Sequence, residues 1–162
     1  MHMVVTAIVG GLLVGAAISD AMTLRIPNAI PAMLVGLFAA SALLTTMPLD
    51  AVLWHVVAGV AVLVLGMGLF YLNALGGGDA KLLAAISLWA GTSLLIQLVM
   101  MISLAGLAFA VLIYLLRAIG VAARLEKRGW RGFAAGRMCP YGIAIAGGWL
   151  LLVFVVPALM AG

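Results

Sequence analysis

Five long stretches of the chain carry no charged residue and are filled almost entirely by apolar residues. These stretches are residues 1–19, 26–49, 51–78, 82–116 and 138–162. A helix needs roughly 20 apolar residues to cross the hydrocarbon core of a bilayer, so four of the stretches each suit one membrane-spanning helix. The stretch 82–116 is too long for one span, and Gly91-Thr92-Ser93 offers a break inside it.

The pattern therefore predicts six transmembrane helices in an all-α, polytopic membrane bundle. Their approximate ranges are 3–22, 29–47, 52–72, 80–91, 94–117 and 140–160. The fourth helix is short, because twelve residues at 1.5 Å each cover only about 18 Å. We expect residues 1–162 to form a single membrane-embedded domain.

Composition narrows the class of protein further. Hydrophobic residues make up 68% of the chain and charged residues 7%, whereas a soluble domain carries about 25% charged residues. A soluble enzyme and a disordered chain are therefore excluded. The single cysteine, Cys139, excludes an internal disulfide and a Cys-x-x-Cys metal site. Phosphate-loop, dinucleotide and zinc-helix motifs are absent from the sequence, so we expect no cofactor and no metal.

The few charges predict the orientation in the membrane. In a six-span chain, the connections after the first, third and fifth helices share one side. Those connections carry all eight basic residues, namely Arg25, Lys81, Arg117, Arg124, Lys127, Arg128, Arg131 and Arg137. The opposite connections carry only Asp50. By the positive-inside rule the basic side is cytoplasmic and both termini face outward. The net charge of +4 then indicates contact with anionic lipid, not with nucleic acid.

Acidic residues near membrane spans are costly, so each of the four needs a reason. Glu126 lies among basic residues, and a solvated ion pair explains it. Asp50 follows Pro48 and is expected to cap the third helix. Asp20 is less easily explained, because it lies in the last turn of the first helix, where the helix dipole opposes an anion. Its ordinary interpretation is an ion pair with Arg25.

Asp79 directly follows Gly76-Gly77-Gly78 at the start of the fourth helix. Its ordinary interpretation is an N-cap. Three successive glycines exceed what a cap needs, and they allow positive φ and a close approach by another chain. Lys81 either pairs with this aspartate or anchors the helix at the interface.

Considered together, Asp20 and Asp79 suggest chemistry. The predicted topology puts both at the same membrane face and at similar depth. Two adjacent carboxylates share one proton, which is the arrangement with which aspartic proteases activate water and protonate a substrate carbonyl. The sequence leaves open whether the two helices are neighbours.

Three motifs carry a resemblance to a known family. They are Asp20 followed after five residues by Ile26-Pro27-Asn28, then Gly76-Gly77-Gly78-Asp79-Ala80-Lys81, and finally Pro140-Tyr141-Gly142-Ile143-Ala144. Over about residues 10–150 the chain resembles the type IV prepilin peptidases, which are membrane aspartyl proteases with a Gly-x-Gly-Asp motif. The short form looks most like the peptidases of tight-adherence (Flp-type) pilus systems.

The resemblance implies that Asp20 and Asp79 are the catalytic pair of an endopeptidase without a metal. The implied substrate is a prepilin with a short polar leader on the cytoplasmic side and an apolar helix in the membrane, cut between the two. The implied location is the cytoplasmic membrane of a bacterium or archaeon.

Supporting roles follow as expectations. Gly76 and Gly78 keep the loop open for an extended substrate backbone. Pro27 ends the connection before the second helix, and Asn28 caps that helix. Lys81 either tunes the catalytic pair or meets lipid phosphate.

Longer family members carry an N-terminal cytoplasmic methyltransferase region with paired cysteines. The sequence gives no sign of that region, so we do not expect N-methylation of the product. The basic segment 118–139 is expected to be a surface loop. Three rival functions stay open, namely a proton-coupled transporter, a non-catalytic pilus or secretion assembly subunit, and a presenilin-like protease. The oligomeric state is also left open.

Overall fold

The computed structural model describes residues 2–130 and 140–160, and the regular structure in these ranges is helical. The helices are α1 (His2–Thr23), α2 (Ala29–Leu44), α3 (Leu49–Tyr71), α4 (Gly77–Ala118), α5 (Val121–Lys127) and α6 (Tyr141–Met160). Three of them, α1, α3 and α4, are long and apolar enough to cross a membrane. Helix α2 and residues Tyr141–Val155 of α6 are also apolar but shorter. The predicted all-α membrane bundle is therefore confirmed.

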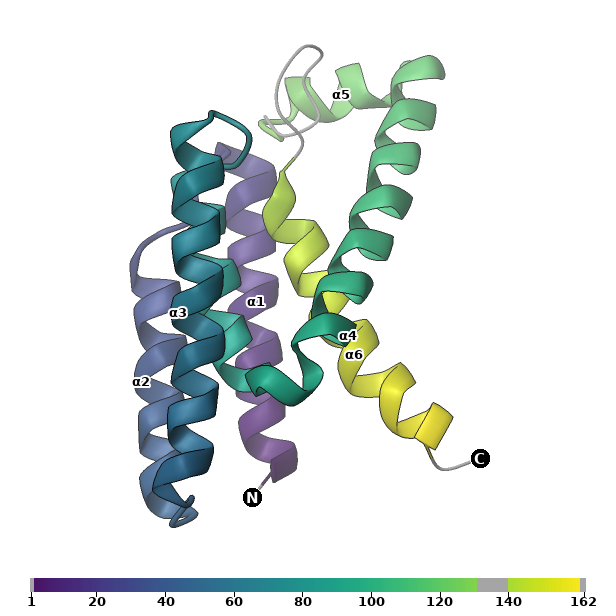
Figure 1. The fold of residues 1–162 in the computed structure, drawn as a ribbon. Coiled ribbons are helices and arrows are strands. Elements are labelled where there is room, and N and C mark those ends of the chain that lie inside the picture. Colours follow the sequence, from purple (N-terminus) through teal and green to yellow (C-terminus); the bar gives the residue numbers. More distant parts are fainter. Residues whose placement is uncertain (1, 131–139, 161–162) are drawn as a thin grey trace.

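Helix α4 is interrupted at Gly91, where the backbone takes φ 62° and ψ −175°. Only glycine adopts such angles readily, and the two halves of α4 run in different directions (Figure 1). The break predicted at Gly91-Thr92-Ser93 is thus confirmed. The first half begins at Gly77, three residues before the predicted start.

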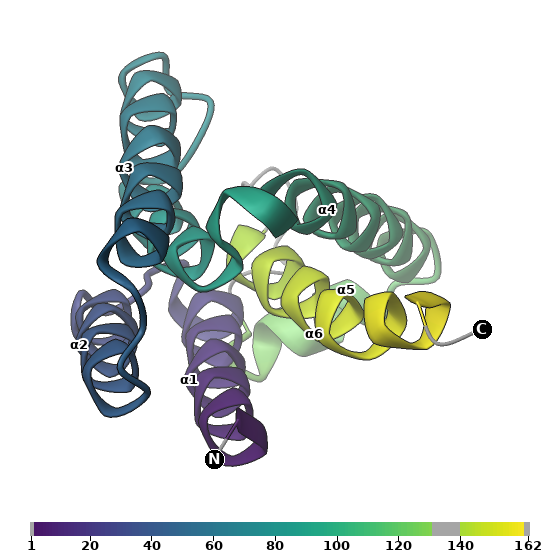
Figure 2. The same ribbon diagram turned by 60° about the horizontal axis from the view of Figure 1, so that its bottom comes forward.

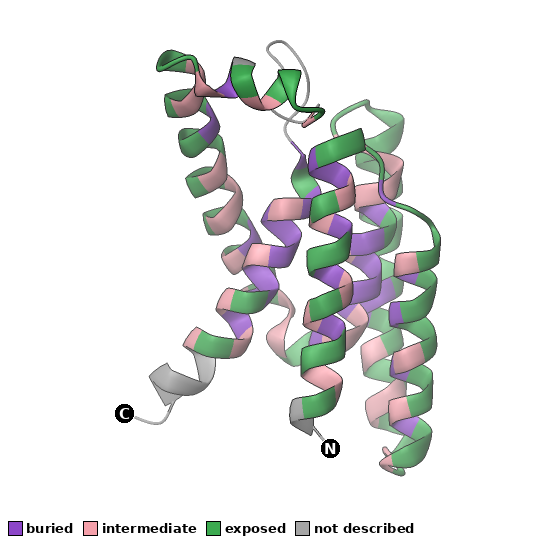
Figure 3. Cartoon of the chain, turned by 180° about the vertical axis from the view of Figure 1, so that it is seen from behind, coloured by how far each residue is buried: buried purple, intermediate pink, exposed green. Residues whose placement is uncertain are grey.

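The core lies where α1, the first half of α4 and α6 face one another. Its fully buried side chains include Leu13 of α1, Leu82 and Ile86 of α4, and Ile145 of α6. Figure 3 shows the buried residues on the facing sides of these helices, with exposed residues on the outside. Many of the exposed side chains are large and apolar, such as Leu43, which is 80% exposed. In a membrane bundle such side chains meet lipid tails.

The second half of α4 and α6 lean away from the group formed by α1, α2 and α3 (Figure 2). The small residues Gly147 and Gly148 of α6 let the two helices approach closely, because Gly148 packs against Ile102 and Gly147 against Ala105 of α4. Close approach at small residues is a common way for helices to associate in membranes.

The connections predicted to carry the basic residues all lie at one end of the bundle, although Lys81 and Arg117 lie inside the ends of α4. The α1–α2 connection, the α3–α4 connection and α5 lie at the top of Figure 1, whereas α1 begins and α6 ends toward the bottom. This arrangement agrees with the alternation of six spans that the charges predicted. It brings the end of α1 and the start of α4 to the same end of the molecule.

Three local predictions were wrong. Asp50 does not cap α3, because Pro48 takes the N-cap position and Asp50 lies inside the first turn, where the helix dipole still favours an anion. Helix α2 ends at Leu44, not at 47, because Thr46 takes a left-handed φ of 49°, which a helix does not contain. The segment 118–139, predicted to be a loop, contains α5; residues 131–139 of that segment lie outside the described residues.

Candidate active site

Asp20 is buried in the last turn of α1, with only 5% of its surface exposed. Its Oδ2 accepts a hydrogen bond from the backbone N–H of Gly142 at 2.8 Å. Gly142 is the second residue of α6, so this N–H is one of those that a helix start leaves without an intrahelical partner. The N-terminus of α6 thereby offsets the unfavourable position of Asp20 at the C-terminus of α1.

The backbone after Asp20 is turned back sharply. Leu24 takes a left-handed φ of 56°, and its N–H donates to the Asp20 carbonyl at 2.8 Å. The Ser19 hydroxyl donates to the Arg25 carbonyl at 2.8 Å. A non-glycine residue in this conformation costs roughly 1–2 kcal/mol, so the surrounding contacts hold the turn. The turn brings Ile26 back beside the start of α4.

Asp79 is the third residue of α4 after its N-cap, Gly76. The backbone N–H of Gly76 donates a hydrogen bond to the Asp79 carboxylate, which is the backward half of a capping box. The prediction that Asp79 is the N-cap of this helix is wrong, because Gly76 takes the N-cap position and Asp79 lies inside the first turn. The other carboxylate oxygen, Oδ1, is buried and has no hydrogen-bond partner among the described residues. A buried oxygen without a partner is unusual and marks a place where a further donor fits.

The side chains of Asp20 and Asp79 come from helices α1 and α4 and lie close enough to interact electrostatically. The structure thus brings together the two acidic residues that the sequence singled out. Asp20 is held by α6 and Asp79 by its own helix start, so each has a separate support.

The three glycines before Asp79 allow tight packing. A side chain at Gly78 would meet Ile26 Cβ at 3.2 Å, and one at Gly77 would meet the Phe70 ring at 3.3 Å. Positive φ is not the reason for these glycines, because Gly76 has φ −71° and the other two lie within the helix. The part of our interpretation that invoked positive φ is wrong. The glycines allow close contacts inside the chain, and the predicted close approach by another chain stays a prediction. A role in holding substrate backbone stays a prediction.

Lys81 and Asn28 contact each other beside this site. The Lys81 ammonium donates to the Asn28 amide oxygen at 3.0 Å. The prediction that the Asn28 side chain caps α2 is wrong, because this side chain makes no capping hydrogen bond and its oxygen accepts from Lys81. The Pro27 carbonyl accepts from the Ile30 N–H at 3.1 Å, which starts α2.

Sequence reasoning gave Gly142 no role of its own. The motif around it was noticed, but a hydrogen bond between residues 122 positions apart depends on how α6 meets α1. A Cβ at Gly142 would lie 3.0 Å from Asp20 Oδ2, so only glycine fits here comfortably. In the described ranges, 2–130 and 140–160, no group of three or more His, Cys, Asp or Glu side chains is placed to hold a metal ion.

Comparison with known proteins identifies the family of the chain. Curated proteins and solved structures give no match to the chain. The sequence model of the type IV leader peptidase family matches residues 7–111, a range that includes Asp20 and Asp79 and ends before Gly142. The match covers more than half of the chain, and the chain therefore belongs to the type IV leader peptidase family.

Proposed function

We propose that this chain is an aspartic endopeptidase that removes the short leader from Flp-type prepilins, with Asp20 and Asp79 as its catalytic pair. The observation that carries the proposal is the electrostatic interaction between these two carboxyl groups, which come from different helices at the end of the bundle where the α1–α2 connection, the α3–α4 connection and α5 lie. By the positive-inside rule this end is cytoplasmic. The enzyme then works in the cytoplasmic membrane, at the face where a prepilin leader is found.

The proposed reaction is hydrolysis of one peptide bond. Two neighbouring carboxyl groups hold one proton between them, because both cannot ionise cheaply at short range. The ionised one takes a proton from water, and the water oxygen attacks the carbonyl carbon. The protonated one donates to the carbonyl oxygen, and collapse of the tetrahedral intermediate breaks the C–N bond and passes a proton to the leaving amine. Asp79 Oδ1, buried without a partner in the described chain, is the oxygen best placed to receive the water.

Isosteric variants test the proposal. A Flp-type prepilin is co-expressed with the native chain, with Asp20→Asn or with Asp79→Asn, and its mass is measured. Asp50→Asn is the matched control, since Asp50 is an acidic residue at the start of α3, at the other end of that helix from the paired carboxyl groups. We expect a leader-sized loss of mass with the native chain and the control, and an uncut prepilin with the other two variants.

Two results would contradict the proposal. Cleavage by the Asp79→Asn chain would exclude the catalytic pair. An uncut prepilin beside the native chain, inserted in the membrane at normal level, would exclude the proposed substrate.

A further inference from the structure

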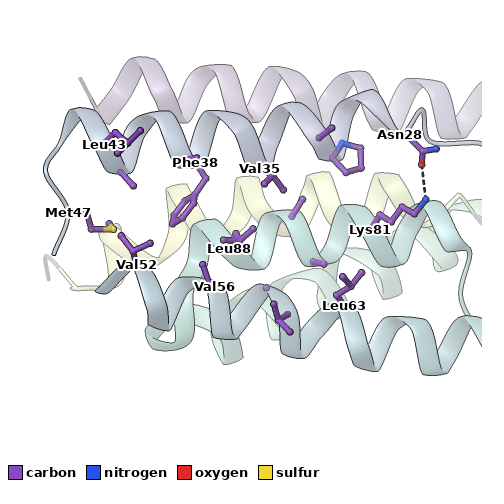
Figure 4. A pocket seen from close by; sticks show the side chains of 18 of the residues that line it. Asn28, Val35, Phe38, Leu43, Met47, Val52, Val56, Leu63, Lys81 and Leu88 are labelled. Carbon is purple, nitrogen blue, oxygen red and sulfur yellow. Dashed lines mark hydrogen bonds between the residues drawn. The ribbon is translucent and has the colours of Figure 1, made fainter. Parts of the chain in front are cut away.

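An apolar groove of about 980 Å³ runs between α2 and α3, with the first half of α4 along its floor (Figure 4). Its lining is apolar except at one end, where Asn28 and Lys81 form their hydrogen bond. The lining follows α2 from residue 28 to residue 43, which corresponds to about 22 Å at 1.5 Å per residue. The groove therefore extends over much of the apolar depth of the bundle.

The lining residues have the spacing of a helix-packing seam. On α2 the seam is formed by Ala32, Val35, Ala39 and Ala42. On α3 it is formed by Val52, Val56, Gly59 and Leu63. Steps that alternate between three and four residues are the pattern with which one helix packs along another. Both helices thus present such a seam to the same space.

The floor of the groove is made of small residues. Ala84 and Ala85 of α4 lie between the two seams, with Leu88 further along. Small residues allow helix backbones to approach closely in membranes, where packing and not the hydrophobic effect holds helices together. Three helices that face one space in this way leave room for a fourth helix.

The polar end of the groove lies at the turn of α4 that carries Asp79. Lys81 follows Asp79 by two residues, which is about 3 Å along the helix axis and about 200° around it, so the two side chains leave this turn on nearly opposite faces. A chain that leaves the groove at the Lys81–Asn28 end therefore emerges at the turn of α4 that carries Asp79. This continuity favours a substrate as the occupant over a lipid tail or a second copy of the chain.

We propose that the groove between α2 and α3 holds the apolar helix of the prepilin substrate, with the start of that helix at Lys81 and Asn28. This inference rests on the proposed function, because a prepilin is cut just before its apolar helix. The groove aligns the helix along the bundle, and the extended segment ahead of it crosses the start of α4 toward Asp20 and Asp79. Specificity then comes partly from the helix, far from the cut bond.

Photo-crosslinking tests where the helix lies. A photoreactive residue replaces Val56, which lines the groove, or its neighbour Val57, which is 50% exposed outside it. The full chain also carries Asp79→Asn, so that uncut prepilin stays bound in the membrane. We expect an adduct with the prepilin helix at least tenfold stronger from position 56 than from position 57. Equal adducts from both positions, or adducts from position 56 only with lipid or with a second copy of the chain, would overturn the proposal.

Kinetics separate this proposal from the proposed function. Ala39→Trp fills the groove, and Ala40→Trp, one residue on, is the control outside it. For full-length prepilin we expect KM to rise at least tenfold with Ala39→Trp and to stay unchanged with Ala40→Trp. We expect both variants to cleave equally well a short peptide that spans the cut but lacks the apolar helix. Cleavage of this peptide would also show that the Ala39→Trp chain is folded.

Failure of the proposed function and failure of the groove proposal give different results. No cleavage of either substrate by the native chain would contradict the proposed function itself. Normal cleavage with equal KM for Ala39→Trp and Ala40→Trp would contradict the groove alone. If the Ala39→Trp chain turns over neither substrate, the crosslinks from positions 56 and 57 decide.

Discussion

The imidazole ring of His55 lies against Gly91, at the point where α4 changes direction. Its Nδ1 is 2.6 Å from the Leu88 carbonyl oxygen. A carbonyl oxygen only accepts hydrogen bonds, so Nδ1 carries the hydrogen and donates it. A helix interrupted at Gly91 leaves the carbonyls of its preceding turn short of partners. His55 of α3 supplies one, and thereby stabilises the break that separates the two halves of α4.

Gly91→Ala is expected to destabilise the protein strongly. The new Cβ would lie 2.8 Å from His55 Cε1, at a backbone with φ +62°. Such backbone angles cost roughly 1–3 kcal/mol for a residue other than glycine, and the steric overlap adds about 1–3 kcal/mol. Thermal unfolding in detergent measures the effect. Gly36→Ala on α2 is the control, because nothing lies within 4 Å of its new Cβ. An equal melting temperature for the two variants would contradict the proposed strain.

His55→Phe is expected to lower stability by roughly 0.5–1.5 kcal/mol, the usual net contribution of one hydrogen bond, because the bond to the Leu88 carbonyl is only partly buried. Phenylalanine keeps a ring that can stack on Phe38, whose centroid lies 5.4 Å from that of His55. The loss therefore reports the hydrogen bond to Leu88 and not the packing. Denaturant unfolding of the two chains provides the measurement, and an unchanged free energy of unfolding would show that the carbonyl finds another donor.

Gly66 of α3 packs so closely against Ala80, in the first turn of α4, that the size of one residue limits the size of the other. A Cβ at Gly66 would lie 3.0 Å from the Ala80 Cβ, so Gly66→Ala forces the two helices apart at the residue next to Asp79. We expect a loss of roughly 1–3 kcal/mol, partly restored by the second change Ala80→Gly. The restoration is partial because glycine inside a helix itself costs about 1 kcal/mol.

The control for this pair is Gly68→Ala on the same helix, where nothing lies within 4 Å of the new Cβ. Melting temperatures of the single and double variants in detergent give the comparison. If Ala80→Gly adds its own loss in full to that of Gly66→Ala, the two positions do not interact and the contact is unimportant.

Much of the fold could be predicted from the sequence because a membrane leaves few choices. Charge-free runs mark helices, and Gly91-Thr92-Ser93 marked the break in α4. Helix α5 was missed because its seven residues include three charged ones and no long apolar run. The start of α4 was placed three residues late, since glycines at a helix start look like a loop in sequence.

The site was predictable only in part. Asp20 and Asp79 stand out because a carboxylate near a membrane span is expensive. The residues that position this site, Gly142 and Ile26, do not stand out in the sequence. They are ordinary residue types, and their contacts depend on how three helices meet. The groove was not foreseen, because it results from the separation of α2 and α3, and neighbours in sequence usually pack together.

The Lys81–Asn28 hydrogen bond is expected to matter little for stability. Both side chains are exposed, and because solvent screens the ammonium charge, such a contact contributes roughly 0–1 kcal/mol. A double-mutant cycle with Lys81→Met and Asn28→Ala, followed by thermal unfolding, should give a coupling near the lower end of that range. A coupling above about 2 kcal/mol would show that this contact holds α2 to α4 and supports the fold.

Gly142→Ala is expected to reduce prepilin cleavage without unfolding the chain. Its Cβ would lie 3.0 Å from Asp20 Oδ2 and 3.3 Å from Ile26 Cδ1, so the Asp20 carboxyl group must move away from the N-terminus of α6. Each 1.4 kcal/mol of transition-state stabilisation that is lost when the carboxyl group moves lowers the rate about tenfold. We therefore expect kcat/KM to fall about tenfold or more in proteoliposomes. Gly106→Ala, whose Cβ would make an ordinary contact of 3.4 Å with the Ala144 Cβ, is the control. Full activity of the Gly142→Ala chain would mean that catalysis does not depend on the position α6 gives to Asp20.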